Sequence, residues 1–198
     1  MDKCQNIMIW GSNIFLELHL NDKGIYSLGD TWSFKLKKHK IDNYSMKSLD
    51  TQKALNYMIK ILKKENNYNQ AVIELGIVDL INIINGKETI DTFKQNLIQI
   101  ITILKFKNIK PIIFTVCPIV ASSFKIKHNL QAIDDDIILN HKRINHLIKE
   151  IALEYEITLI DDNKAITKKK NIYMNDDGLT INGVGHDMVK NMLQRKII

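Results

Sequence analysis

Short apolar runs alternate with amphipathic stretches along the whole chain of 198 residues. The runs are nearly unbroken by polar residues, which is typical of strands that are buried on both faces of a sheet. They predict strands over 6–10, 71–75, 111–119 and 157–161, with a further, edge-like strand over 40–45.

The amphipathic stretches carry apolar residues at three- and four-residue spacing, which is the period of a helix. They predict helices over 31–39, 48–65, 89–108, 134–156 and 182–196. Ser48 or Asp50 could cap the helix over 48–65. Asp134, Asp135 and Asp136 open a helix, where their charges complement its dipole.

Strands that alternate with helices predict an α/β protein, a three-layer αβα sandwich around a five-stranded parallel sheet. The length suits a single domain over 1–198. Ligands of such sheets bind at the carboxyl ends of the strands. The segments that follow the strands therefore hold the candidate chemistry: 11–13, 45–50, 76–79, 118–123 and 161–180.

The net charge of +6 comes mostly from scattered lysines, with dense clusters only at 35–40 and 168–170. No aromatic residues are interleaved with these clusters, which favours solvated faces over a nucleic-acid surface. No run approaches the ~18 apolar residues of a membrane span, and the N-terminus lacks the features of a signal peptide. We expect a cytoplasmic protein without a membrane span, in which Cys4 and Cys117 are reduced and mostly buried.

Four motifs stand where the predicted strands end or just before the last helix. They are "IWGSNIF", "IELGIVDL", "FTVCPI" and "NDDGLTINGVGH". In this order they resemble the blocks of the SGNH (GDSL-type) hydrolases, from about residue 6 to 195. The resemblance implies the flavodoxin-like SGNH hydrolase fold. It also implies hydrolysis of esters, such as acyl or acetyl groups on lipids, sugars or other small molecules.

The first block of that family is Gly-Asp-Ser, and its serine is the nucleophile. A Gly of the second block and an Asn of the third form the oxyanion hole with the backbone amide at the nucleophile. The resemblance places Gly11 on the first glycine, Ser12 on the Asp and Asn13 on the nucleophile. The second block is vague, and Ser48 or a neighbour falls where its glycine is expected.

In "GIVD", Gly76 and Asp79 match the third block, while Val78 replaces the Asn. The last block, Asp-x-x-His, holds the acid and the base. Asp177 matches the acid, and Thr180 replaces the histidine. The resemblance thus preserves the pattern of the fold while the four diagnostic positions, Asn13, Ser48, Val78 and Thr180, are changed.

These changes matter for ester hydrolysis, which needs a nucleophile, a base and oxyanion donors. The amide of Asn13 is no useful nucleophile, Val78 donates no hydrogen bond, and Thr180 is no base near neutral pH. Loss of one oxyanion donor costs roughly 10²–10³ in rate. Loss of the nucleophile or the base costs on the order of 10⁶.

We therefore expect a catalytically degenerate protein whose pocket, lined by the changed positions, binds a small-molecule or acylated ligand or a protein partner. The alternative is an active ester hydrolase or acyltransferase, with Ser12 as a displaced nucleophile, Asp177 as the acid and an unidentified base. His186 lies six residues after Thr180 in a predicted helix, and we expect it to face solvent.

The remaining polar residues suggest no cofactor. His141 and His146 are five apart on one helix, a poor spacing for a metal pair. His128 is expected in a loop, and Asp161 and Asp162 either form a turn or face the cleft. No Gly-x-Gly-x-x-Gly occurs, which argues against a dinucleotide site. We expect neither a metal nor another cofactor.

Overall fold

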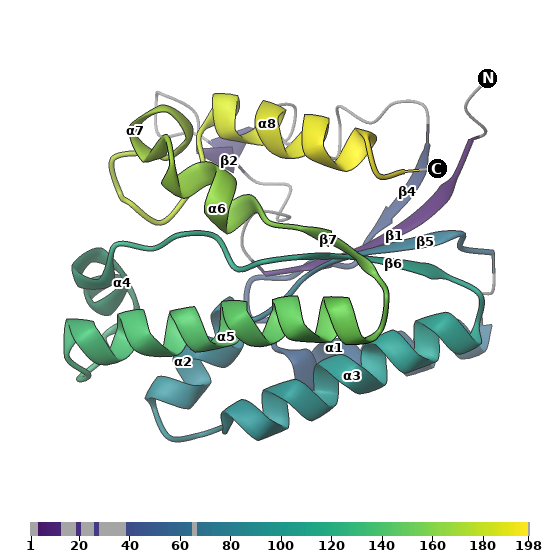
Figure 1. The fold of residues 1–198 in the computed structure, drawn as a ribbon, viewed down its shortest axis with the longest axis horizontal. Coiled ribbons are helices and arrows are strands. Elements are labelled where there is room, and N and C mark those ends of the chain that lie inside the picture. The colour runs from purple at the N-terminus through teal and green to yellow at the C-terminus, as the bar shows by residue number, and fades with distance from the viewer. Residues whose placement is uncertain (1–3, 13–18, 21–25, 28–38, 65–66, 198) are drawn as a thin grey trace.

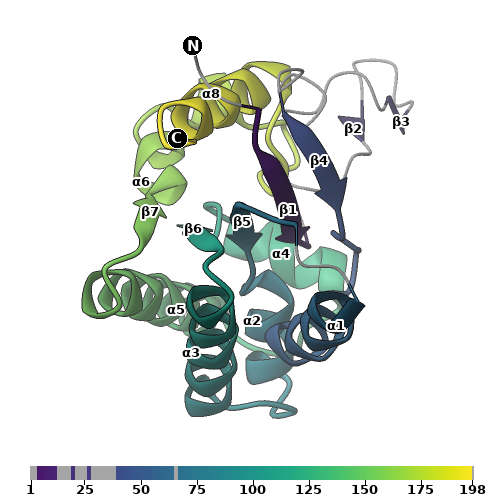
Figure 2. The same cartoon turned by 90° about the vertical axis from the view of Figure 1, so that its right-hand side faces the viewer.

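A computed structural model describes residues 4–12, 19–20, 26–27, 39–64 and 67–197. Its central feature is a parallel sheet of five strands in the order β4-β1-β5-β6-β7 (Figures 1 and 2). The strands are β1 (Asn6–Gly11), β4 (Lys40–Asn43), β5 (Gln70–Glu74), β6 (Lys110–Phe114) and β7 (Thr158–Ile160). The predicted α/β class and five-stranded parallel sheet are confirmed, with the 40–45 strand at an edge as expected.

Helices cover both faces of the sheet, as Figure 1 shows. On one face lie α1 (Thr51–Lys64), α2 (Ile77–Ile84), α3 (Ile90–Phe106) and α5 (Asp134–Glu154). On the other face lie α6 (Asp162–Thr167), α7 (Lys170–Tyr173) and α8 (Gly183–Gln194). The remaining helix, α4 (Ala121–His128), lies beyond the ends of the strands, beside the start of α5.

The structure differs from the predicted elements at several places. The sequence analysis missed the short helices α2, α4, α6 and α7, and the small antiparallel pair β2 (His19–Leu20) and β3 (Tyr26–Ser27). The strand predicted over 111–119 ends at Phe114. The amide of Thr115 still donates to the carbonyl of Ile160 in β7, but beyond it side chains hold the backbone; Asn145, for example, accepts from the amide of Val116. Positions 31–38 of the helix predicted over 31–39 lie outside the described residues.

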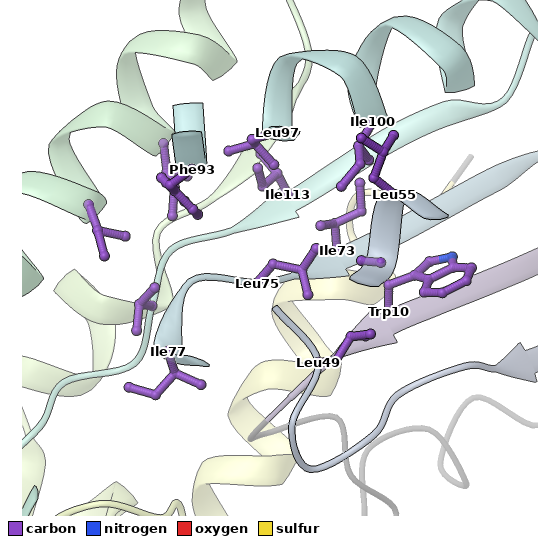
Figure 3. Packing of buried hydrophobic residues seen from close by; sticks show 14 of the residues in the cluster. Trp10, Leu49, Leu55, Ile73, Leu75, Ile77, Phe93, Leu97, Ile100 and Ile113 are labelled. Carbon is purple, nitrogen blue, oxygen red and sulfur yellow. The ribbon is translucent and has the colours of Figure 1, made fainter. Parts of the chain in front are cut away.

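Two apolar cores, one on each face of the sheet, explain the unbroken apolar runs. Successive side chains of a strand point to opposite faces. In β1, Met8 and Trp10 join the larger core, part of which is shown in Figure 3, while Ile7 and Ile9 join the smaller one under α8. Each strand therefore needs apolar residues at nearly every position.

The two cysteines differ, contrary to the expectation that both are mostly buried. Cys117 is buried, whereas Cys4 is exposed. Cys4 lies before the first residue of β1, outside the layers that bury the strand. In the described part of the chain, no helix is long and apolar enough to cross a membrane.

Candidate active site

The predicted site residues that the structure describes lie along one end of the sheet, where β1, β5, β6 and β7 finish; we call this end the carboxyl edge. Parallel strands bring the residues that follow them to the same edge. Ser12 follows β1 there, and its amide donates to Glu74 Oε2 at 3.2 Å. The Ser12 side chain is only 4% exposed, and its hydroxyl has no hydrogen-bond partner among the described residues. Asn13 lies outside the described residues.

Glu74 is a feature that the sequence analysis missed. It is the last residue of β5, in the middle of the sheet, and its side chain is fully buried. The signal was a single acid in the apolar run "AVIEL". A carboxylate is costly to bury unless it accepts hydrogen bonds, and the amide of Ser12 supplies one. Glu74 therefore helps to fix the turn that follows β1.

Gly76 begins the third block and must be glycine for two reasons. Its φ is +126°, a conformation that L residues with a side chain rarely adopt. A Cβ there would lie 2.7 Å from Cγ2 of Val116. Val78, two residues on, is partly buried and packs against the larger core. Its side chain has no donor, so it cannot supply the hydrogen bond that an Asn would offer.

Asp79 is fully buried and holds the start of α1. Its Oδ1 accepts from the amide of Thr51 at 2.9 Å and from the hydroxyl of the same residue. Asn96 on α3 donates to that hydroxyl at 3.2 Å. Burial raises the pKa of Asp79 to about 6, although the hydrogen bonds from Thr51 oppose the shift. The fold thus uses Asp79 as a link between α2, α1 and α3.

Glu88 forms an acidic pair with Asp79. Burial, together with the charges of Asp79 and Asp50, raises the pKa of Glu88 to about 7, against a hydrogen bond from Asn82. Two neighbouring carboxylates that are partly removed from water share a proton more readily than they both ionise.

The segment before α1 presents Ser48 to solvent. Ser48 lies in a turn and is exposed. The cap of α1 is Asp50, whose Oδ1 accepts from the amide of Lys53 at 2.8 Å, so one of the two predicted caps is confirmed. Leu49, between the two, is fully buried in the larger core (Figure 3).

The DGLT loop, residues 177–180, pairs the predicted acid Asp177 with Thr180, which the resemblance places at the position of the base. The hydroxyl of Thr180 donates to Asp177 Oδ2 at 2.7 Å. The amides of Leu179 and Thr180 donate to Oδ1. Partial burial acts to raise the pKa of Asp177, but these hydrogen bonds outweigh it and hold the pKa below its ordinary value. Asn175 donates to the hydroxyl of Thr180 at 2.9 Å.

A second buried polar cluster lies where β6 and β7 end. The hydroxyl of Thr115 donates to Asp162 at 2.6 Å, and burial raises the pKa of this carboxyl to about 7. Burial, with Asp162 and Glu74 nearby, raises the pKa of the Cys117 thiol. Asp161 caps α6 by accepting from the amide of Lys164, which is the turn role foreseen for it.

Side chains of α5 also hold the segment after β6. Asn145 accepts from the amide of Val116 at 2.7 Å and donates to its carbonyl. The ring of His141 bonds the carbonyl of Cys117 at 2.8 Å, and burial lowers the pKa of this histidine. The segment that leads into α4 is therefore firmly positioned.

Two histidines lie elsewhere than expected. His186 is buried, at 4% exposure, because α8 turns this position toward the sheet; the expectation of a solvent-facing residue is wrong. His128 is the last residue of α4 and not part of a loop. His146 is exposed and pairs with Glu150. The described residues contain no group of three or more side chains placed to hold a metal.

Three solved structures resemble this one over nearly its whole length. A lipase/acylhydrolase from Enterococcus faecalis matches with a TM-score of 0.72 at 20% identity, covering 98% of this chain and 95% of that one. An acetyl xylan esterase matches at 0.73 and 18%, covering 98% and 100%. A psychrotrophic esterase from Pseudoalteromonas, solved with the inhibitor monoethylphosphonate, matches at 0.68 and 15%, covering 98% and 96%.

No protein-family model and no curated protein matches the sequence. The structural likeness establishes the fold: the chain has the SGNH (GDSL-type) esterase fold that the motifs implied.

Proposed function

We propose that this chain uses the SGNH esterase fold to bind a small-molecule or acylated ligand at the carboxyl edge without hydrolysing it. One observation carries the proposal: the hydroxyl of Thr180 is the side-chain partner of Asp177. In a serine hydrolase the acid orients a histidine, and that histidine takes the proton of the nucleophile. Here the acid holds an alcohol, which cannot accept a proton near neutral pH.

The surroundings of Ser12 support the same conclusion. A working serine needs a base within hydrogen-bond reach of its hydroxyl. The hydroxyl of Ser12 has no such partner among the described residues, and its amide is turned to Glu74. Val78 adds no donor for an oxyanion. Loss of a base alone costs on the order of 10⁶ in rate, and without the oxyanion donor at position 78 the residual catalysis falls by roughly a further 10²–10³, so hydrolysis should come close to the uncatalysed level.

The test is hydrolysis of 4-nitrophenyl acetate together with labelling by a fluorophosphonate probe. The wild-type protein should hydrolyse the ester at the rate of buffer alone and take up no probe at Ser12. Ser12→Ala is the informative variant, and Ser122→Ala, an exposed serine on α4, is its matched control. Labelling that disappears in Ser12→Ala and persists in Ser122→Ala would assign a nucleophile and overturn the proposal in favour of an active esterase.

A gain of function sharpens the test. Asn13→Ser, Val78→Asn and Thr180→His together restore the side chains that the resemblance calls for. We expect this variant to hydrolyse the acetate measurably above the parent, because Asp177 already accepts from position 180. A folded but inert triple variant would show that these positions do not form one site.

A further inference from the structure

The sequence holds two Asn-Gly pairs, Asn85-Gly86 and Asn182-Gly183. Such a pair is chemically labile, because glycine has no side chain to hinder its amide nitrogen from attacking the side-chain carbonyl of the asparagine before it. The attack needs an asparagine side chain that can turn and a backbone that can follow it. The two pairs differ on both counts in this structure.

The side chain of Asn182 is held at both of its polar atoms. Its Oδ1 accepts from the amide of Gly185 at 3.0 Å and so caps α8. Its Nδ2 donates to the carbonyl of Ile172 at 2.9 Å and to that of Met174 at 3.3 Å. The backbone is held as well, because the amide of Asn182 donates to the carbonyl of Tyr173 at 2.9 Å. The side chain can turn toward the next nitrogen only after several of these bonds have opened.

The side chain of Asn85 lacks such restraints. Asn85 follows the last residue of α2 as its C-terminal cap, and it is exposed together with Gly86. Within the described part of the chain, no hydrogen bond engages its side chain. A Cβ on Gly86 would meet nothing within 4 Å, so open space surrounds the turn. The side chain of Asn85 is therefore free to turn toward the nitrogen of Gly86.

Two backbone hydrogen bonds are the remaining restraint on this turn. The amide of Gly86 donates to the carbonyl of Ile83 at 3.0 Å, and the amide of Lys87 donates to that of Asn82 at 2.8 Å. Both donors lie beyond the last residue of α2, at an exposed helix end, where backbone bonds open at little cost in free energy. Opening the bond to Ile83 releases the nitrogen that would attack.

We propose that Asn85 is a site of spontaneous deamidation, with water as the only co-reactant, and that the fold protects Asn182 from the same reaction. The nitrogen of Gly86 forms a bond to the side-chain carbonyl carbon of Asn85. The bond from that carbon to the side-chain nitrogen breaks, and ammonia leaves with the proton of the Gly86 amide. One water molecule then opens the cyclic imide. It yields aspartate if the new bond is cleaved, and isoaspartate if the original peptide bond is cleaved.

The reaction changes the end of α2. Either product places a negative charge at the C-terminal end of the helix, where the helix dipole disfavours it. Isoaspartate also lengthens the main chain by one carbon, which moves the amides of Gly86 and Lys87 away from their acceptors. The same helix carries Val78 and Asp79 in its first turn, so the modification acts on the element that holds the third block.

The experiment follows both asparagines in the full chain during incubation at mildly alkaline pH. Peptides are analysed by mass spectrometry, which separates the amide from the acid at each position. We expect Asn85 to convert at least about tenfold faster than Asn182, because several hydrogen bonds must open first at Asn182. In urea, where the fold is lost, the two positions should convert at similar rates.

Gly86→Ala is the variant that tests the route. Its Cβ hinders the attacking nitrogen, so conversion of Asn85 should slow severalfold while that of Asn182 stays unchanged. Undiminished conversion of Asn85 in this variant would mean that water hydrolyses the amide directly, and the imide route would be wrong.

The comparison between folded and unfolded chains decides the rest. If the folded protein converts Asn85 no faster than Asn182, while both convert in urea, the backbone bonds of the turn protect Asn85 and the proposal is wrong. A difference between the two positions that persists in urea would also overturn it, because the neighbouring sequence and not the fold would then be the cause.

Discussion

Two aspartates that match the same family pattern have opposite environments. Asp79 and Asp177 each accept hydrogen bonds from a threonine hydroxyl and from backbone amides. The pKa of Asp79 is nevertheless raised to about 6, while that of Asp177 is lowered. Burial makes the difference, because Asp79 is fully enclosed and Asp177 is exposed. Similar hydrogen bonds thus surround two different groups. Asp79 is a buried carboxyl with a raised pKa, and Asp177 is a charged carboxylate near solvent.

The largest effect should come from removing the buried carboxylate. Asp79→Ala leaves the amide and the hydroxyl of Thr51 without their acceptor in the interior, and we expect it to lower the free energy of unfolding by about 3 kcal/mol. Asp177→Ala, the matched variant, should cost less than about 1 kcal/mol because water replaces the lost contacts. Urea unfolding measures both. Equal losses would show that burial does not separate the two regions.

The glycine three residues before Asp79 gives the next largest effect. Gly76→Ala places a Cβ 2.7 Å from Val116 at a φ of +126°, and Val116 belongs to the buried core. We expect a loss of about 2–3 kcal/mol from strain and overpacking. Gly86→Ala is the control, because its φ of +67° is also positive but its Cβ would meet nothing within 4 Å. A loss near 1 kcal/mol is expected there from backbone strain alone.

The two regions should also respond to pH with opposite signs. The raised pKa values of Asp79 and Glu88 mean that the folded state binds their protons more tightly than the unfolded chain does. Their stabilisation is therefore full below about pH 4, the ordinary pKa of these groups, and is lost as the pH rises through 6–7. Asp162, with a pKa raised to about 7, adds to the same slope. The lowered pKa of Asp177 contributes stability at neutral pH that is lost in acid.

The measurement is the free energy of unfolding at pH 5 and pH 8. We expect the wild type to be less stable at pH 8 by on the order of 1–2 kcal/mol, with the half-exposed Glu88 counted at a discount for solvent screening. Glu88→Gln should reduce the difference by removing one of the titrating groups. An unchanged difference in this variant would mean that Glu88 does not titrate with Asp79.

The sequence predicted the sheet well, because a strand that is buried on both faces needs an apolar residue at nearly every position. The strands predicted over 6–10, 71–75 and 157–161 lie between the two apolar cores. Their apolar residues therefore form runs that do not alternate with polar ones. The short helix α4 escaped prediction for the converse reason. α4 has apolar and basic residues without a clear period, and it is held in place by contacts from distant segments, such as the bond from Val120 to Gly178.

The candidate site was predictable in its positions but not in its contacts. The motifs placed Asp177 and Thr180 three residues apart, and the structure joins them by a hydrogen bond. Nothing local in the sequence shows that Asp79 is enclosed or that Glu74 accepts from Ser12, because both depend on strands and helices brought together by the fold. His186 was misjudged for the same reason, since the face of α8 that meets the sheet is set by packing.

The smallest predicted effect isolates the hydroxyl of Thr180. Thr180→Val keeps the shape and the backbone amides of the DGLT loop and removes only the donor to Asp177 Oδ2. We expect the pKa of Asp177 to rise while staying below its ordinary value, with a stability loss of about 0.5 kcal/mol for a solvated hydrogen bond. The corresponding change at the buried aspartate, Thr51→Val, should cost about 2 kcal/mol, because Asn96 then loses its acceptor in the interior. Carboxyl NMR titration of Asp177 measures the first change, and Thr180→Ser should restore the wild-type value. If Thr180→Val leaves that titration unmoved, the threonine does not hold the acid, and the central support for a protein without a catalytic base is lost.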